Sequence, residues 1–156
     1  MEGARLAVPT DVGSVSSIAE RASIEFQQVR GGAMVLAREL AGPPIDVQLL
    51  RAIDDGAALA VVGGYDEVVF GYGLATFDRL TEGRLIVVVS HLVVDAEARG
   101  VGIGGTMMSL ILDEARAIGC TGIDSVALPG DRSTKSFFES FGLKTRLLTV
   151  HCHLDP

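Results

Sequence analysis

The segment 99–105, Arg-Gly-Val-Gly-Ile-Gly-Gly, has the residue types of an anion-binding turn. Glycine has no Cβ, so the backbone can approach an anion closely. A helical pattern follows the turn, and the first amides of a helix have no partner inside it and carry partial positive charge. Arg99 adds a full charge that can contact phosphate. The segment therefore predicts a phosphate or pyrophosphate site at the start of a helix.

The same turn contains Gly100-x-Gly102-x-x-Gly105, the glycine spacing of a dinucleotide-binding motif. Asp124 follows at about the expected spacing of 20 residues. Two observations argue against that motif. Residues 95–98 separate the preceding strand from the turn, and only one strand-helix-strand unit follows, too little for a doubly wound sheet. A purely structural turn is the other alternative, but each glycine inside a helix costs about 1 kcal/mol.

Length, composition and charge limit the class of protein. With 156 residues, 48% of them hydrophobic, we expect one domain over residues 1–156. The net charge of -7 argues against a nucleic-acid partner and suits a cationic substrate such as an amine, although a charge that only keeps the protein in solution is the simpler interpretation. The longest apolar run, 85–89, is too short to cross a membrane. Because no secretory signal is seen, Cys120 and Cys152 are interpreted as reduced thiols of a cytoplasmic protein.

Hydrophobic periodicity alternates between the helical and the strand type, which predicts one mixed α/β domain. Helices are expected over 11–28, 33–40, 45–53, 102–118 and 132–141. Thr10 or Asp11 can cap the first of them, and Gly119 can end the fourth. Strands are expected over 5–8, 57–62, 68–77, 84–94, 123–128 and 143–154, with a hairpin turn at 63–67.

Two segments resemble a known family. Residues 92–105 resemble the pyrophosphate motif [QR]-x-x-G-x-[GA] of the GNAT superfamily of N-acetyltransferases, whose three fixed positions are filled by Arg99, Gly102 and Gly104. Residues 135–143, KSFFESFGL, are similar to the helix that ends in FYEKxGF in that family. The resemblance implies a GNAT-like fold, with a central, mixed, largely antiparallel sheet flanked by helices on both faces.

The resemblance also implies acetyl-CoA as the cosubstrate. The backbone of Leu92 and Val94 would pair with the pantetheine arm, and the Leu92 amide would polarise the thioester carbonyl. The turn amides would hold the pyrophosphate, and the Thr106 hydroxyl could assist. The implied cofactor-binding residues are Leu92, Val93, Val94, Arg99, Gly100, Val101, Gly102, Ile103, Gly104, Gly105 and Thr106.

Transfer to an amine requires a base, because a lysine-type amine has a pKa of about 10.4 and is protonated at neutral pH. In the family the base often lies just before the thioester site, where this chain has Ser90 and His91. In a regular strand Ser90 shares the face of Leu92 and His91 points the opposite way, and a bulge could exchange them. The family's usual tyrosine, which protonates the departing thiolate, is replaced here by Phe138. Tyr72 could act as the acid in its place. Core packing is the alternative role for His91 and Tyr72.

Several other residues have weaker interpretations. Glu25 lies where acceptor sites of this family often have a carboxylate, although a solvated helix face is the simpler role. Asp131 replaces a frequent asparagine. His151 and His153 alternate without a third ligand, so no metal site is predicted. The edge of the last strand, 145–153, could pair between subunits in a homodimer.

The resemblance implies an acetyltransferase that moves an acetyl group from acetyl-CoA to an amine acceptor, either a small molecule or a protein. The reaction would be direct attack in a ternary complex. A non-catalytic acyl-CoA-binding regulator is the alternative, which Phe138 and the non-basic Ser90 favour. A tRNA-acetylating enzyme of the same fold is disfavoured by the acidic charge. The sequence contains no motif that identifies the acceptor.

Overall fold

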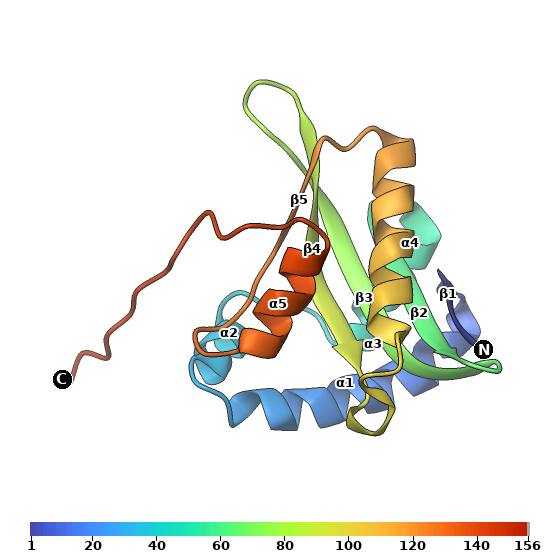
Figure 1. The fold of residues 1–156 in the computed structure, drawn as a ribbon, viewed down its shortest axis with the longest axis horizontal. Coiled ribbons are helices and arrows are strands. Elements are labelled where there is room, and N and C mark those ends of the chain that lie inside the picture. Colours follow the sequence, from blue (N-terminus) through green and yellow to red (C-terminus); the bar gives the residue numbers. More distant parts are fainter. Residues whose placement is uncertain (156) are drawn as a thin grey trace.

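Five strands form one sheet in the order β1-β2-β3-β4-β5 in the computed structural model, which describes residues 1–155 (Figure 1). Neighbouring strands are antiparallel except β4 and β5, which are parallel. This arrangement confirms the predicted mixed, largely antiparallel sheet. The strands are β1 (Glu2–Leu6), β2 (Ala58–Tyr65), β3 (Val68–Arg79), β4 (Leu85–Val94) and β5 (Gly122–Ser125).

Helices cover both faces of this sheet, as predicted. On one face α1 and α3 bury a cluster that includes Val15 and Leu49 against Leu74 of β3. On the other face α4 buries Met107 and Ile111 against β2 and β4. No helix described within residues 1–155 is long and apolar enough to cross a membrane. The helices are α1 (Val12–Gln27), α2 (Gly32–Ala37), α3 (Ile45–Asp55), α4 (Ile103–Ile118) and α5 (Arg132–Ser140).

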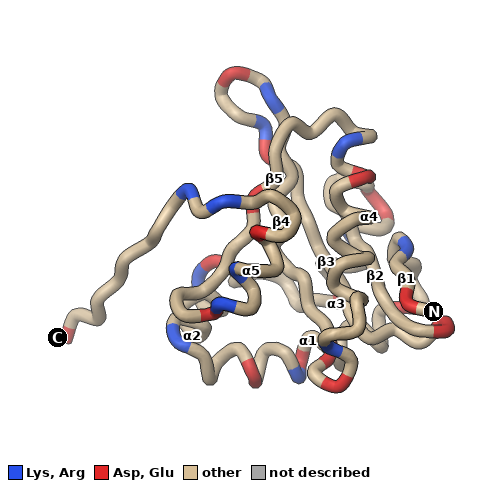
Figure 2. Tube along the Cα trace, viewed as in Figure 1, with Lys and Arg blue, Asp and Glu red and all other residues tan. Residues whose placement is uncertain are grey.

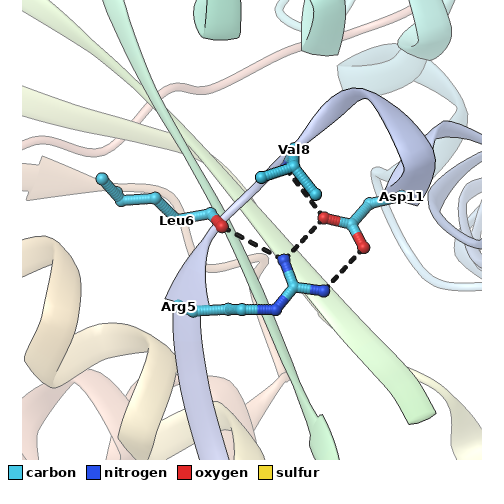
Figure 3. A network of polar contacts seen from close by, with 4 residues as sticks. All are labelled: Arg5, Leu6, Val8 and Asp11. Atoms are coloured by element: carbon cyan, nitrogen blue, oxygen red, sulfur yellow. Dashed lines mark hydrogen bonds and ion pairs between the residues drawn. The ribbon is translucent and has the colours of Figure 1, made fainter. Parts of the chain in front are cut away.

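Asp11 anchors the start of α1 to β1 (Figure 3). It is buried, and its two oxygens accept hydrogen bonds of 2.7 and 2.8 Å from the Arg5 guanidinium. Oδ2 also accepts from the Val8 amide at 2.8 Å, which caps the short 3-10 turn Pro9–Asp11. The Asp11 side chain therefore makes no capping hydrogen bond to α1. Capping of that helix by Asp11 was one of the two predicted alternatives. The Arg5 hydrogen bonds lower the pKa of Asp11, so this buried group stays ionised and paired.

The β2–β3 turn is tighter than the predicted turn over 63–67. Asp66 and Glu67 alone form it, with φ angles of 45° and 71°, and such positive angles suit the twist of a two-residue hairpin. Gly63 and Gly64 belong to β2 instead. A Cβ on Gly63 would lie 2.7 Å from Cγ of Met107. This glycine therefore allows α4 to approach the sheet closely and does not reverse the chain.

The largest error of the sequence analysis is the last strand. Residues 143–154 pair with no strand in the described chain, and they extend away from the sheet (Figure 1). β5 also ends at Ser125, three residues earlier than the predicted 123–128. An apolar alternation indicates a strand only when an edge is present to pair with it. The tail has the alternation, but it does not pair with the outer edge of β5, the end strand of the sheet.

Candidate functional site

The second half of β4 has an uncovered backbone edge. The whole strand pairs with β3, but β5 pairs with it only over 86–89. The Asp95 amide donates to the Phe70 carbonyl of β3 at 2.7 Å. Because backbone groups of an antiparallel strand alternate between its two edges, the amides and carbonyls of Leu92 and Val94 face away from β3. They face the side that β5 no longer covers.

A bulge at Ser90 decides which face of the sheet His91 occupies. Val89 pairs with Ala75 and His91 pairs with Leu74, so Ser90 has no partner on β3. One extra residue reverses the alternation of side chains along a strand. Val89 therefore faces α4, whereas His91 lies beside Leu74 on the α1 and α3 face.

The bulge leaves His91 and Leu92 on opposite faces. Leu92 and Val94 pack toward α4, and Val93 packs toward α1 and α3. The bulge that the sequence analysis left open is thus present, and it moves His91 away from the face of Val89 and Leu92 onto it. His91 and Leu92 still point opposite ways, as neighbours in a strand do.

The hydrogen bonds of Ser90 orient the His91 ring. Its Oγ donates to the Leu74 carbonyl at 3.2 Å and lies 3.0 Å from Nδ1 of His91. A hydroxyl has one proton to donate. When the Ser90 hydroxyl donates it to the Leu74 carbonyl, Nδ1 of His91 is the donor to Oγ. Nε2 then carries the lone pair. Burial lowers the pKa of His91, which keeps the ring neutral at pH 7.

Tyr72 packs against this histidine with a ring-centroid distance of 5.9 Å. Its side chain is buried, and burial raises the pKa of the phenol above its ordinary value. A thiol has a pKa of about 8.5, which is below that of this phenol. Moving a proton from Tyr72 to a departing thiolate would therefore be unfavourable. The geometry suits a ring that holds His91 better than it suits an acid.

The glycine turn opens α4 as the sequence predicts. Gly102 is the residue before the helix and has a left-handed φ of 96°. The Thr106 amide donates to the Gly102 carbonyl at 3.0 Å, so the three amides between them lie at the helix end, where helical geometry supplies no acceptor. No acidic side chain occupies the first turn. The Thr106 hydroxyl donates to the Ile103 carbonyl at 2.9 Å, so its proton is used within the helix.

The space around the turn is open, although the carboxylates of Glu2 and Asp113 lie near it. A Cβ on Gly100 or Gly105 would meet nothing within 4 Å. A Cβ on Gly104 would lie at an ordinary contact distance of 3.6 Å from both Phe137 of α5 and Val94 of β4, so the turn lies close to the open edge. A hollow of about 510 Å³ adjoins the turn, and its lining includes Gly102, Gly105, Thr106 and Phe141.

Arg99 points to α1, so its side chain is already engaged. Two of its nitrogens donate to the Glu25 carboxylate at 2.6 and 2.8 Å, and Nε donates to the Val94 carbonyl at 3.0 Å. These hydrogen bonds lower the pKa of Glu25. The sequence analysis expected Arg99 to contact phosphate and Glu25 to face solvent or an acceptor. In the structure they fix the turn to the end of α1.

A second ion pair lies one helical turn earlier. Arg21 of α1 donates to Asp95 at 2.5 Å. Arg21 and Glu25 are four residues apart, as are Asp95 and Arg99, and the charges run in opposite order on the two segments. We call these four residues the charge clamp; Figure 2 shows both signs of charge where α1 passes the β4–α4 loop. Sequence reasoning missed it because 74 residues separate the members of each pair.

The remaining predicted positions are spread over α5 and the tail. Phe138 is buried and packs edge-on to Phe137, with centroids 5.5 Å apart. Asp131 caps α5 by accepting from the Thr134 amide at 3.0 Å. His151 and His153 lie on the exposed tail. Within residues 1–155 the structure brings together no group of three or more His, Cys, Asp or Glu side chains able to hold a metal ion.

Comparisons with known proteins agree with this architecture. The model of the Acetyltransferase (GNAT) family matches residues 33–143. No curated protein matches the chain. A tetramutant protein from Bacillus halodurans is 21% identical, with 97% of this chain and 99% of that chain covered and a TM-score of 0.75.

Two named enzymes have a similar fold. A ribosomal-protein-alanine N-acetyltransferase from Brucella melitensis biovar Abortus is 16% identical, with 99% of this chain and 100% of that chain covered and a TM-score of 0.69. An aminoglycoside acetyltransferase from an uncultured soil metagenomic sample is 14% identical, with 99% of each chain covered and a TM-score of 0.70. At these identities the likeness shows the fold.

Proposed function

Because the chain belongs to the acetyltransferase (GNAT) family, we propose that it transfers an acetyl group from acetyl-CoA to an amine. One observation carries the proposal. The uncovered edge of β4 leads directly into the glycine turn at the start of α4, and Gly104 lies against Val94. A backbone edge and an anion-binding helix end, side by side, match the amide-containing arm and the pyrophosphate of one ligand.

The residues that would hold acetyl-CoA follow from this geometry. The amides of Leu92 and Val94 and the Leu92 carbonyl are available to the pantetheine arm, in the way a sheet edge accepts a further strand, whereas the Val94 carbonyl already accepts from Arg99. The amides after Gly102 would hold the pyrophosphate. The clamp residue Arg99 would act indirectly, by holding the turn in place. Acetyl-CoA supplies the activated acyl group as a thioester.

His91 is the proposed base. The acceptor nitrogen attacks the thioester carbon, a carbon–nitrogen bond forms and the carbon–sulfur bond breaks. The proton of the amine passes to Nε2 of His91 directly or through one water. Ser90 would take part through its contact with the other ring nitrogen, Nδ1, which orients the base. The departing thiolate takes its proton from solvent, since Phe138 has none to give.

A non-catalytic acyl-CoA-binding regulator is the second candidate. It is favoured by the phenylalanine at 138 and by the raised pKa of Tyr72, which together leave no evident acid in the site. A protein from Bacillus halodurans with a similar fold, 20% identical, is named a transcriptional regulator. Binding of acetyl-CoA without turnover on any amine would establish this second function.

Calorimetric titration of acetyl-CoA into the wild type and a Gly105→Glu variant tests the proposed site. Gly105 has ordinary helical geometry and open space at its Cβ, so the variant adds a carboxylate without backbone strain. Two like charges 4 Å apart repel by about 4 kcal/mol at an effective dielectric constant of 20. We therefore expect at least about 100-fold weaker binding.

Gly13→Glu is the matched control. Gly13 is an exposed residue of α1 whose Cβ would also meet nothing within 4 Å, so the change of charge is the same but lies outside the turn. Equal weakening by both variants would contradict the site. An amine panel with aminoglycosides and peptide N-termini would then separate the two candidate functions, and no turnover on any member would reject the enzyme.

A further inference from the structure

One carboxylate faces the glycine turn from the first strand of the sheet. Glu2 lies at the start of β1, which runs beside α4 (Figure 1). Its Cγ and Oε1 atoms are 3.7 and 3.8 Å from the position that a Cβ on Gly102 would take. Ala4 packs into the cluster beneath α4, and residues two apart in a strand share a face. The pleat of β1 therefore directs Glu2 toward the start of α4.

Glu2 carries its negative charge at neutral pH. Hydrogen bonds from its own backbone amide and from the Tyr65 hydroxyl lower the pKa of its carboxyl. Tyr65 is also the partner of Glu2 in the register of β1 and β2, so the contact follows from the sheet itself. The Met1 amine, which acts on Glu2 as well, is paired with Asp66 at 2.8 Å. The carboxylate is therefore ionised when an anion approaches the turn.

The hollow beside the turn adds no compensating side chain. Asp113 of α4 lines it, and within the described part of the chain none of its lining residues is Lys or Arg. Asp113 has an exposed partner of its own, Arg116, at 3.3 Å. Arg99, which precedes the turn, is engaged by Glu25. An anion in the turn would thus be attracted by backbone amides and opposed by Glu2.

We propose that Glu2 is a repulsive residue that limits the affinity of the glycine turn for its anionic ligand and shortens the time that CoA stays bound. The inference rests on the proposed function, in which acetyl-CoA is that ligand. Repulsion between exposed charges is screened beyond about 8 Å at physiological salt, so a carboxylate in contact with Gly102 lies within range. Donor and product carry the same phosphates, and a limited affinity allows the product CoA to leave after transfer.

Calorimetric titration of acetyl-CoA at about 0.05 M and about 0.5 M salt tests the role of this charge. Glu2→Gln removes the charge at nearly constant shape and should bind about fivefold more tightly at low salt. The gain should shrink at high salt, because screening removes the repulsion that the variant relieves. Glu2→Asp keeps the charge and should gain less than Glu2→Gln. Because Glu2 is exposed, both variants should keep the fold, and thermal unfolding checks this.

Glu20→Gln is the matched control. Glu20 is an exposed residue of α1, on the other side of the sheet from α4, so the same charge is lost far from the turn. Its affinity for acetyl-CoA should equal that of the wild type. A second probe, CoA without its 3′-phosphate, carries less charge, so it should gain less than CoA from Glu2→Gln. Stopped-flow displacement should show the gain for CoA as slower dissociation.

The outcomes separate this inference from the proposed function. Unchanged or weaker binding of acetyl-CoA by Glu2→Gln would overturn the role of Glu2, as would an equal gain in Glu20→Gln or a gain that persists at high salt. A wild type that binds acetyl-CoA, and loses it in Gly105→Glu, would leave the proposed site standing in each of these cases. A wild type that does not bind acetyl-CoA at all would reject the proposed function itself.

Discussion

The two sides of the candidate site along β4 consist of different chemical groups. At its open edge and toward α4, the site consists of backbone groups and glycines, and the partly exposed charge clamp ties this part to α1. Toward α1 and α3, it consists of the buried Tyr72, the half-buried His91 and the hydroxyl of Ser90. In the proposed reaction the first part would hold the ligand without titrating, and the second would move a proton without binding the nucleotide. One strand separates the two tasks, so substitutions should separate binding from turnover.

The largest effect expected on the second face comes from His91→Gln. Glutamine keeps a polar side chain but cannot take the proton, so turnover on a reactive amine should fall about 10²–10⁴-fold. The dissociation constant of acetyl-CoA should change less than twofold, because the face toward α4 is untouched. Steady-state kinetics and calorimetry measure the two quantities. His151→Gln in the tail is the matched control, and a comparable loss there would contradict the role of His91.

The pH profile sharpens this prediction. Burial lowers the pKa of His91 below its ordinary value, and the base acts only in its neutral form. Activity with the wild type should therefore be level through neutral pH and should fall only as the pH drops below about 6.5, the ordinary histidine pKa. His91→Gln should lack this acidic decline. A decline that persists in the variant would assign the titration to another group.

The charge clamp should have a smaller effect, and on the other quantity. Its members are partly exposed, so each pair contributes about 0.2–1 kcal/mol. Arg21→Glu or Asp95→Arg should weaken acetyl-CoA binding at most about fivefold, and the double exchange should restore it. Calorimetry on the four proteins measures the coupling, with Arg84→Glu in the β3–β4 hairpin as an indifferent ion-pair control. Effects that simply add would show that the pair does not position the turn.

The smallest effect is expected from Tyr72→Phe. The ring that packs on His91 is kept, and the hydroxyl with its raised pKa is removed. Turnover should change less than about twofold, since a phenol that holds its proton this firmly is a poor acid for a thiolate. Single-turnover rates measure this step. A loss near 100-fold would restore Tyr72 as the acid and remove the main argument for the regulator.

Elements that depend on residues close together in the sequence were predicted correctly. The glycines of the turn, the start of α4 at Ile103 and its end at Gly119 depend on residues within a few positions of one another. The β4 strand and α5 likewise follow from short-range pattern. The same reasoning misplaced the β2–β3 turn. Gly63 is a residue type typical of turns, but in the structure its lack of a Cβ makes room for Met107.

Contacts between segments far apart in the sequence were not predicted. The tail has a clear strand pattern, but no edge in the same chain meets it. Glu25 and Arg99 form a close ion pair, yet no local feature of either residue indicates the other. Which interpretation is correct for such residues depends on what the fold places beside them.

The sequence by itself determined the glycine turn before α4, the order of the elements as far as α5 and the acidic character, because each depends on neighbouring residues or on composition alone. Only the tertiary structure decided the face that His91 occupies, since a single unpaired residue at Ser90 reverses the alternation of the strand. It also decided that Arg99 holds α1, and that β4 has an uncovered edge beside the turn. Those are pairings between distant segments, and a linear pattern does not encode which partner is within reach.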